Sequence, residues 1–150
     1  IDLRIKYREN KRWSYAIGYR SISDYSMSSN IQQKGRLYLD AYYSKKIKRY
    51  FIDLRSRLLT QGNSYSSKEV FRQKFKLSYN IRKTKLEPSL AIELFYNFDN
   101  SFYKVRNSLE LAHPINKKLD FSLVYKIEHE FNMNDPMTLF IFEPKISYRF

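Results

Sequence analysis

The 150-residue sequence has no cysteine and only three glycines. Without cysteine, the chain can form neither a disulfide framework nor a thiolate metal site. The scarcity of glycine argues against a soluble β-sandwich, whose turns ordinarily use more of it. No apolar stretch approaches the roughly 20 residues that a membrane-spanning helix requires. No signal peptide is visible, so we expect a mature or truncated product.

Aromatic residues are abundant instead, with 14 tyrosines and 11 phenylalanines. Such residues favour the pleated surface of a β-sheet. The mean hydropathy of -0.63 would normally indicate a soluble protein. A membrane β-strand, however, averages an apolar and a polar face, so this value does not exclude a β-barrel in a membrane.

The formal charge of +13 raises the question of nucleic-acid binding. Most charged residues alternate with apolar ones, and the others lie in short turns. Aromatic and basic side chains would therefore lie on opposite faces of a strand, whereas an RNA-binding sheet needs them on one face. We expect no nucleic-acid partner.

Nine runs alternate between apolar and polar residues with the period of two that is typical of β-strands. They span residues 1–9, 12–22, 34–45, 49–60, 71–82, 87–98, 102–112, 119–130 and 139–150. Their length of roughly 9 to 12 residues suits a tilted strand that crosses a bilayer. The pattern predicts an all-β, antiparallel, up-and-down transmembrane barrel that forms a single domain over residues 1–150.

The links between the runs alternate in length. Longer polar links at 23–33, 61–70 and 132–138, with a short exception at 99–101, alternate with tight basic links. The tight links lie at 10–11, 46–48, 83–86 and 113–118. Long loops on one rim and short periplasmic turns on the other are typical of outer-membrane barrels.

In each run every second residue belongs to one face of the predicted strand. On the apolar face, aromatic residues lie near both ends and aliphatic residues lie between them, as bilayer interfaces favour. The predicted lipid-interface aromatics are Tyr7, Trp13, Tyr15, Tyr19, Tyr43, Tyr50, Phe71, Tyr79, Tyr96, Phe98, Tyr103, Phe121, Phe140, Phe142 and Tyr148. The last run ends on Phe150, and Ile146, Tyr148 and Phe150 share its apolar face. These three residues predict a C-terminal signal for the barrel-assembly machinery.

The opposite parity carries the charges, which would face a lumen and must be paired there. The predicted network comprises Arg4, Lys6, Arg8, Arg20, Arg36, Asp40, Asp53, Arg55, Arg57, Arg72, Lys74, Lys76, Glu93, Lys104, Arg106, Glu110, Asp120, Lys126, Glu128, Glu143 and Lys145. A salt-bridged plug is one reading of this set. A narrow anion-preferring pore is the other, because basic residues are in excess.

Single-chain bacterial barrels have even strand numbers, so nine runs predict a tenth strand that precedes Ile1. A barrel of eight strands, with one run discarded, is the alternative. Pro144 lies inside the last run, where proline marks either a bulge or an edge strand.

Several short motifs resemble a family of small outer-membrane barrels of unknown function from Bacteroidetes-type Gram-negative bacteria. They are Arg55 and Arg57 in Arg-x-Arg, the stretch PSLAIELFY from Pro88, the pair Tyr19-Arg20 and the final Tyr-x-Phe. The resemblance implies a barrel in the bacterial outer membrane, with an additional strand upstream, and it implies no activity.

Only Glu128, His129 and Glu130 form a candidate catalytic group, of the kind used by an outer-membrane hydrolase. Alternation would turn His129 toward lipid and both glutamates toward the lumen, so we expect no enzyme. No phosphate loop, metal-ligand cluster or cofactor motif is present.

We therefore expect a structural or accessory outer-membrane protein, a subunit of a larger outer-membrane complex. Its surroundings would be outer-membrane lipid and lipopolysaccharide. The loop 23–33 offers Tyr25, Met27 and Ile31 as exposed apolar contacts for a partner. A pore, a hydrolase and a soluble β-sandwich binding protein are the alternatives.

Overall fold

The computed structural model describes residues 1–25, 31–60, 69–97, 101–116, 118–132 and 134–148. This part of the chain forms nine strands and no helix. The strands are β1 (Asp2–Arg8), β2 (Trp13–Tyr25), β3 (Ile31–Ile47), β4 (Tyr50–Leu59), β5 (Glu69–Tyr79), β6 (Glu87–Asn97), β7 (Ser101–Pro114), β8 (Leu119–Glu130) and β9 (Thr138–Tyr148).

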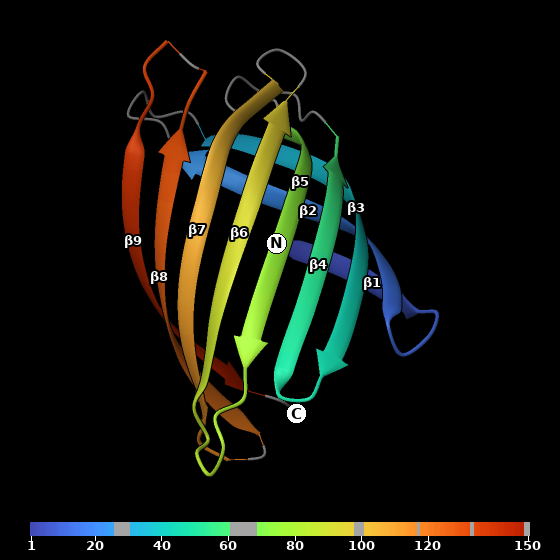
Figure 1. The fold of residues 1–150 in the computed structure, drawn as a ribbon. Helices are drawn as coiled ribbons and strands as arrows, with labels where there is room; N and C mark the ends of the chain where they lie inside the picture. Colours follow the sequence, from blue (N-terminus) through green and yellow to red (C-terminus); the bar gives the residue numbers. More distant parts are fainter. Residues whose placement is uncertain (26–30, 61–68, 98–100, 117, 133, 149–150) are drawn as a thin grey trace.

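Each strand pairs antiparallel with the next, so all nine belong to one continuous sheet. The sheet curls strongly, so that β2 passes behind β4 to β7 and β1 passes behind β4 (Figure 1). The nine predicted strands and their antiparallel order are confirmed. The sheet is not closed, because β1 and β9 are its two edges. No helix in the described residues is long and apolar enough to cross a membrane.

Two expectations about the strands are wrong. The predicted loop 23–33 is shorter, because Ser23 to Tyr25 extend β2 and pair with Ile31 to Gln33 of β3. Cross-strand backbone pairing therefore continues past the last strongly alternating residues. The alternative of eight strands is also wrong, since each of the nine runs pairs with its neighbour. Met27 lies outside the described residues.

None of the described turns contains glycine. Lys48, Lys83 and Asn132 adopt positive φ angles of 54°, 63° and 55°. The Asn10 side chain accepts hydrogen bonds from the backbone N–H groups of Arg12 and Trp13, at 2.8 and 2.9 Å. Asparagine readily forms such local turns. This explains how a chain with three glycines can form tight hairpins.

The sheet has two chemically different faces. The inner face, defined by Asp40, Glu93 and Glu128, is buried inside the curl, and these side chains are 3–6% exposed. The outer face, defined by Ile17, Leu39 and Leu109, is apolar, and these residues are 52–57% exposed. A soluble protein normally buries such residues, so the usual arrangement is inverted.

Tyr103 does not lie where the alternation predicts. The register between β6 and β7 shifts at Phe95 and Tyr96, because Phe95 pairs with Lys104 and Tyr96 pairs with Phe102. The additional residue, Tyr103, is 7% exposed and contacts the ring of the buried Phe95 at 6.4 Å. A β-bulge thus turns Tyr103 inward, and the prediction of an interface aromatic is wrong there.

Pro144 lies in the edge strand β9, opposite Leu123 of β8. The register of this pair of strands runs without a shift, so no bulge accommodates the proline. Of the two alternatives drawn from the sequence, the edge position is therefore the one observed. Proline is tolerated there because its nitrogen can point away from the only paired neighbour.

Candidate functional site

The inner face carries all the charged residues predicted for the interior. The register aligns them across strands, for example Lys74 with Glu93, Glu93 with Arg106, and Arg106 with Glu128. Residues directly opposite one another on paired strands share a face. Their role in a lumen stays a prediction, but their common side of the sheet is a feature of the fold.

A first cluster on this face surrounds Asp40 of β3. Arg57 donates two hydrogen bonds to its carboxylate, at 2.6 and 2.7 Å, and both side chains are at most 5% exposed. The Tyr42 hydroxyl donates a further hydrogen bond to Asp40, at 2.6 Å. The guanidinium of Arg57 also lies over the Tyr38 ring, 4.1 Å from its centre. The buried charges are therefore closely matched.

The first cluster continues to the edge of the sheet. The Tyr38 hydroxyl donates to Asp2 at 2.7 Å, and Arg20 pairs with the same carboxylate at 2.6 Å. The side chains of Arg20 and Asp2, at the edge of the inner face, are both 40% exposed. Gly18 lies directly beneath the Tyr38 ring, where any side chain would collide with it.

A second network joins β4, β6, β7 and β8. Glu93 accepts hydrogen bonds from Arg55 at 2.6 Å and from Arg106 at 3.2 Å. Arg106 also donates to Glu128 at 2.6 Å, and Lys104 pairs with Glu128 at 3.5 Å. The pairs made by Arg106 and Lys104 connect neighbouring strands, whereas Arg55 on β4 reaches across β5 to Glu93 on β6. Polar networks whose members are satisfied rigidify the region that they connect.

Phe95 lies at the centre of this network. It is an aromatic residue on the face that carries the charged side chains. Its side chain is fully buried, at 0% exposure. The cationic groups of Arg72, Lys104 and Arg106 lie 4.8–5.0 Å from the centre of its ring. Cations are attracted to the face of an aromatic ring, and more strongly where water is excluded. Sequence reasoning missed Phe95; its one signal was an aromatic residue among inward charges.

A basic cavity of about 460 Å³ opens on the inner face between these clusters. Nine cationic side chains and three carboxylates line it, which leaves a large positive excess. The cations are Arg20, Arg55, Arg57, Arg72, Lys74, Lys76, Arg106, Lys126 and Lys145, and the carboxylates are Glu93, Glu110 and Glu143. Lys76 pairs with Glu110 at 2.7 Å, and Lys126 and Lys145 share Glu143.

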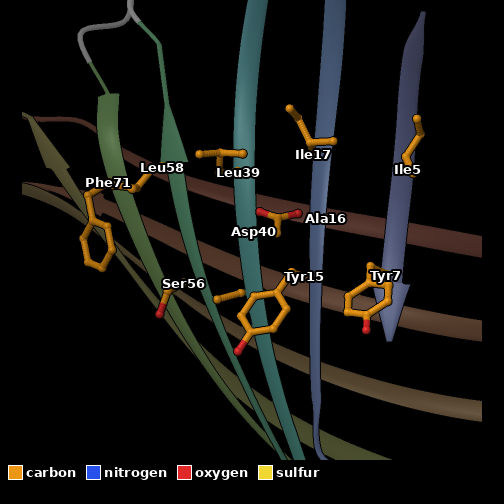
Figure 2. A pocket seen from close by; sticks show the side chains of 11 residues that line it. Ile5, Tyr7, Tyr15, Ala16, Ile17, Leu39, Asp40, Ser56, Leu58 and Phe71 are labelled. Atoms are coloured by element: carbon orange, nitrogen blue, oxygen red, sulfur yellow. The ribbon is translucent and has the colours of Figure 1, made fainter. Parts of the chain in front are cut away.

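An apolar groove of about 480 Å³ lies on the outer face. Ile5, Ile17 and Leu39 line up across β1, β2 and β3 above the rings of Tyr7 and Tyr15 (Figure 2). The small residues Ala41 and Ser56 lie opposite each other on β3 and β4 and also line the groove. The groove thus forms where small side chains interrupt a surface of large ones.

The candidate catalytic residues do not converge. Glu128 and Glu130 lie on the inner face, where Lys104 contacts both carboxylates. His129 is exposed on the other face, and its Nδ1 lies 2.8 Å from Thr138 Oγ1. A general base and its acid need to share one site. Among the described residues, no group of three metal-binding side chains forms a metal site.

The other predicted interface aromatics in the described residues lie on the outer face. Their ring contacts lie near strand ends: Trp13 with Tyr43 and Tyr50 with Tyr79 at 5.0 Å, at one end. Tyr96 contacts Phe102, which the prediction omitted, at 5.7 Å near the other. Ile146 and Tyr148 of the predicted C-terminal signal are 74% and 55% exposed. Phe98 and Phe150 lie outside the described residues.

Residues 1–137 match a family model described as a protein of unknown function, DUF2490. No curated protein and no solved structure matches the chain significantly.

Proposed function

The chain belongs to the DUF2490 family, and we propose that it is an outer-membrane β-barrel protein with a structural or accessory role. The single observation that carries the proposal is the apolar outer face of a one-layered sheet. Ile5, Leu39 and Leu109 are 75%, 54% and 57% exposed there, and no second layer covers them in the described residues. A continuous apolar surface promotes aggregation in water, whereas contact with lipid stabilises it.

Closure of the sheet is part of the proposal. An odd number of antiparallel strands leaves β1 and β9 running in the same direction, so their direct pairing would be parallel. A tenth strand between them would make every pair antiparallel and would satisfy both edges. Unpaired edges are not tolerated in hydrocarbon, which is why membrane sheets close. Amide hydrogen exchange of the full-length protein in detergent tests this: closure protects β1 and β9 as strongly as β6.

The membrane assignment predicts that a charge on the outer face is tolerated according to its depth. Leu39→Arg places a cation in the middle of the apolar face and should cost about 2–4 kcal/mol of folding free energy in a bilayer. Ile47→Arg, at the last residue of β3 and on the same face opposite Tyr50, is the matched control and should cost about 0–1 kcal/mol. Folding into lipid vesicles followed by urea titration measures both. Equal costs, or folding without any lipid or detergent, would refute the assignment.

The accessory role predicts a protein neighbour in the outer membrane. A photo-crosslinking residue at Tyr15, which lines the apolar groove, should capture a defined partner in whole cells. The same photo-crosslinking residue introduced at Leu109 tests a part of the outer face that does not belong to the groove. Capture of a single protein from Tyr15 alone supports a docked subunit. Lipid adducts at both positions would show a barrel surrounded by lipid and would refute the accessory role.

The excess of cations in the inner cavity favours a second candidate, a narrow anion-preferring pore. Recordings in planar bilayers separate the two functions. A current with a reversal potential set by the anion would support the pore. Absence of current from protein that has folded into the bilayer would rule it out.

A further inference from the structure

Cations face one another directly across β4 and β5 on the inner face. Arg57 is opposite Arg72, and Arg55 is opposite Lys74. Like charges in directly opposite positions repel and destabilise a sheet. Arg57 is neutralised by Asp40 behind it, at 2.6 Å. The pair of Arg55 and Lys74 is less well compensated.

Arg55 and Lys74 have unused hydrogen-bonding capacity. Arg55 gives one terminal nitrogen to Glu93, at 2.6 Å, but its Nε is buried and has no hydrogen-bond partner. Lys74 lies opposite Glu93, yet it forms no ion pair with any of the described residues. Buried donors without a partner are rare and costly in native proteins.

Both side chains line the basic cavity, together with the hydroxyl-bearing Ser108. The cavity volume of about 460 Å³ is many times the roughly 30 Å³ share of one water molecule. It therefore has room for a polyatomic anion and its hydration. Arginine and lysine donors together suit the several acceptor oxygens of an oxyanion.

We propose that the inner cavity binds a phosphate group between Lys74 and Arg55. The bound oxygens would lie between the two facing cations and reduce their mutual repulsion. The inference goes beyond the proposed function, because binding needs the inner face of the sheet and requires neither conduction nor a partner protein. The group can belong to a free phosphate or to a lipid headgroup, since the two share this chemistry.

Calorimetric titration of the full-length protein in a nonionic detergent tests the proposal. One arm uses inorganic phosphate and the other uses short-chain phosphatidic acid, both in chloride at constant ionic strength. Saturable binding of inorganic phosphate identifies a free oxyanion as sufficient, and binding of the lipid alone identifies a headgroup. Either result supports the site, and binding of neither by folded protein overturns it.

Lys74→Gln should weaken the binding about tenfold or more, because it removes one charge-assisted contact. Lys85→Gln is the matched control: it removes the same charge from an exposed turn residue and should leave the affinity unchanged. An equal loss in both variants would show a general charge effect and overturn the proposal.

A second pair of variants tests the proposal even if Lys74→Gln does not fold. Ala91 is buried on the inner face, lines the cavity and lies opposite Lys76. Ala91→Asp supplies a carboxylate to the cavity, whereas Ala91→Asn fills the same space without a charge. In chloride, the aspartate variant should melt at a higher temperature than the asparagine variant. A midpoint no higher would show that the cavity has no need of an anion.

Discussion

The middle of the sheet and its edges differ in burial although they share the same alternating sequence pattern. In β6 every second residue from Ser89 to Asn97 is buried, and Phe95 is completely so. In β1 all seven residues are exposed, and β9 is mostly exposed as well. Alternation therefore decides which face a side chain takes, and the curl of the sheet decides whether that face is covered.

The ion pairs follow the same division. Arg57 and Asp40, near the middle, are at most 5% exposed, whereas Arg20 and Asp2, at the β1 edge, are both 40% exposed. Exposed pairs contribute little to stability, about 0–1 kcal/mol. Breaking a buried pair leaves an uncompensated charge and costs several times more. The stability of the sheet should consequently depend on its middle strands.

The largest effect is expected from Phe95→Ala, which empties the most buried position of the inner face. Loss of a buried phenylalanine costs about 3–5 kcal/mol. The contacts of its ring with Arg72, Lys104 and Arg106 are lost as well. Urea unfolding in detergent micelles measures the change. Phe140→Ala in the edge strand, where the ring is 67% exposed, should cost much less.

A cost for Phe140→Ala equal to that of Phe95→Ala would break the distinction between middle and edge. Phe95→Leu, which keeps an apolar side chain but no ring, sharpens it further. The difference in unfolding free energy between the leucine and alanine variants reports apolar packing. The difference between the wild type and the leucine variant reports the contacts of the ring with the cations around it.

The next largest effect is expected from Asp40→Ala. This change leaves the buried Arg57 without its carboxylate and should cost about 3 kcal/mol or more. Asp2→Ala removes the equivalent partner of Arg20 at the exposed edge and should cost about 1 kcal/mol or less. The same urea titration compares them. Similar costs for the two variants would contradict the difference between the clusters.

The double variant Asp40→Ala with Arg57→Met separates the cost of an orphaned charge from the value of the pair. Replacing both partners removes the buried charge together with its carboxylate. We expect the double variant to be more stable than Asp40→Ala alone.

Much of this fold was predictable from the sequence. All nine strands and their faces follow from a period of two, because backbone geometry alone imposes that period. The bulge at Tyr103 was not predictable, since one additional residue in a strand leaves the composition of a run unchanged. Burial was not predictable either, because β1 and β6 alternate alike and differ only in their neighbours.

The candidate site was likewise only partly predictable from the sequence. The sequence predicted which charged residues share the inner face, but not which of them pair. Lys74 illustrates the difference: Glu93 lies directly opposite, yet Glu93 pairs with Arg55 and Arg106. Pairing depends on the relative tilt and curvature of several strands, and a one-dimensional pattern does not contain that information.

The smallest effect is expected at the glycines, and it again separates the buried face from the exposed one. A Cβ on Gly18 would lie 2.2 Å from the Tyr38 ring, which is 3% exposed and held between Arg57 and Asp2. Because the ring has no room to move, Gly18→Ala should cost about 1–3 kcal/mol.

A Cβ on Gly35 would lie 2.3 Å from the Tyr19 hydroxyl, which is almost as close. Tyr19, however, is 44% exposed on the outer face, so its ring can swing away. Gly35→Ala should therefore cost less than Gly18→Ala, although the two contact distances are alike. Thermal unfolding of the two variants side by side checks this order, and a larger loss for Gly35→Ala would show that contact distance, rather than burial, decides the cost.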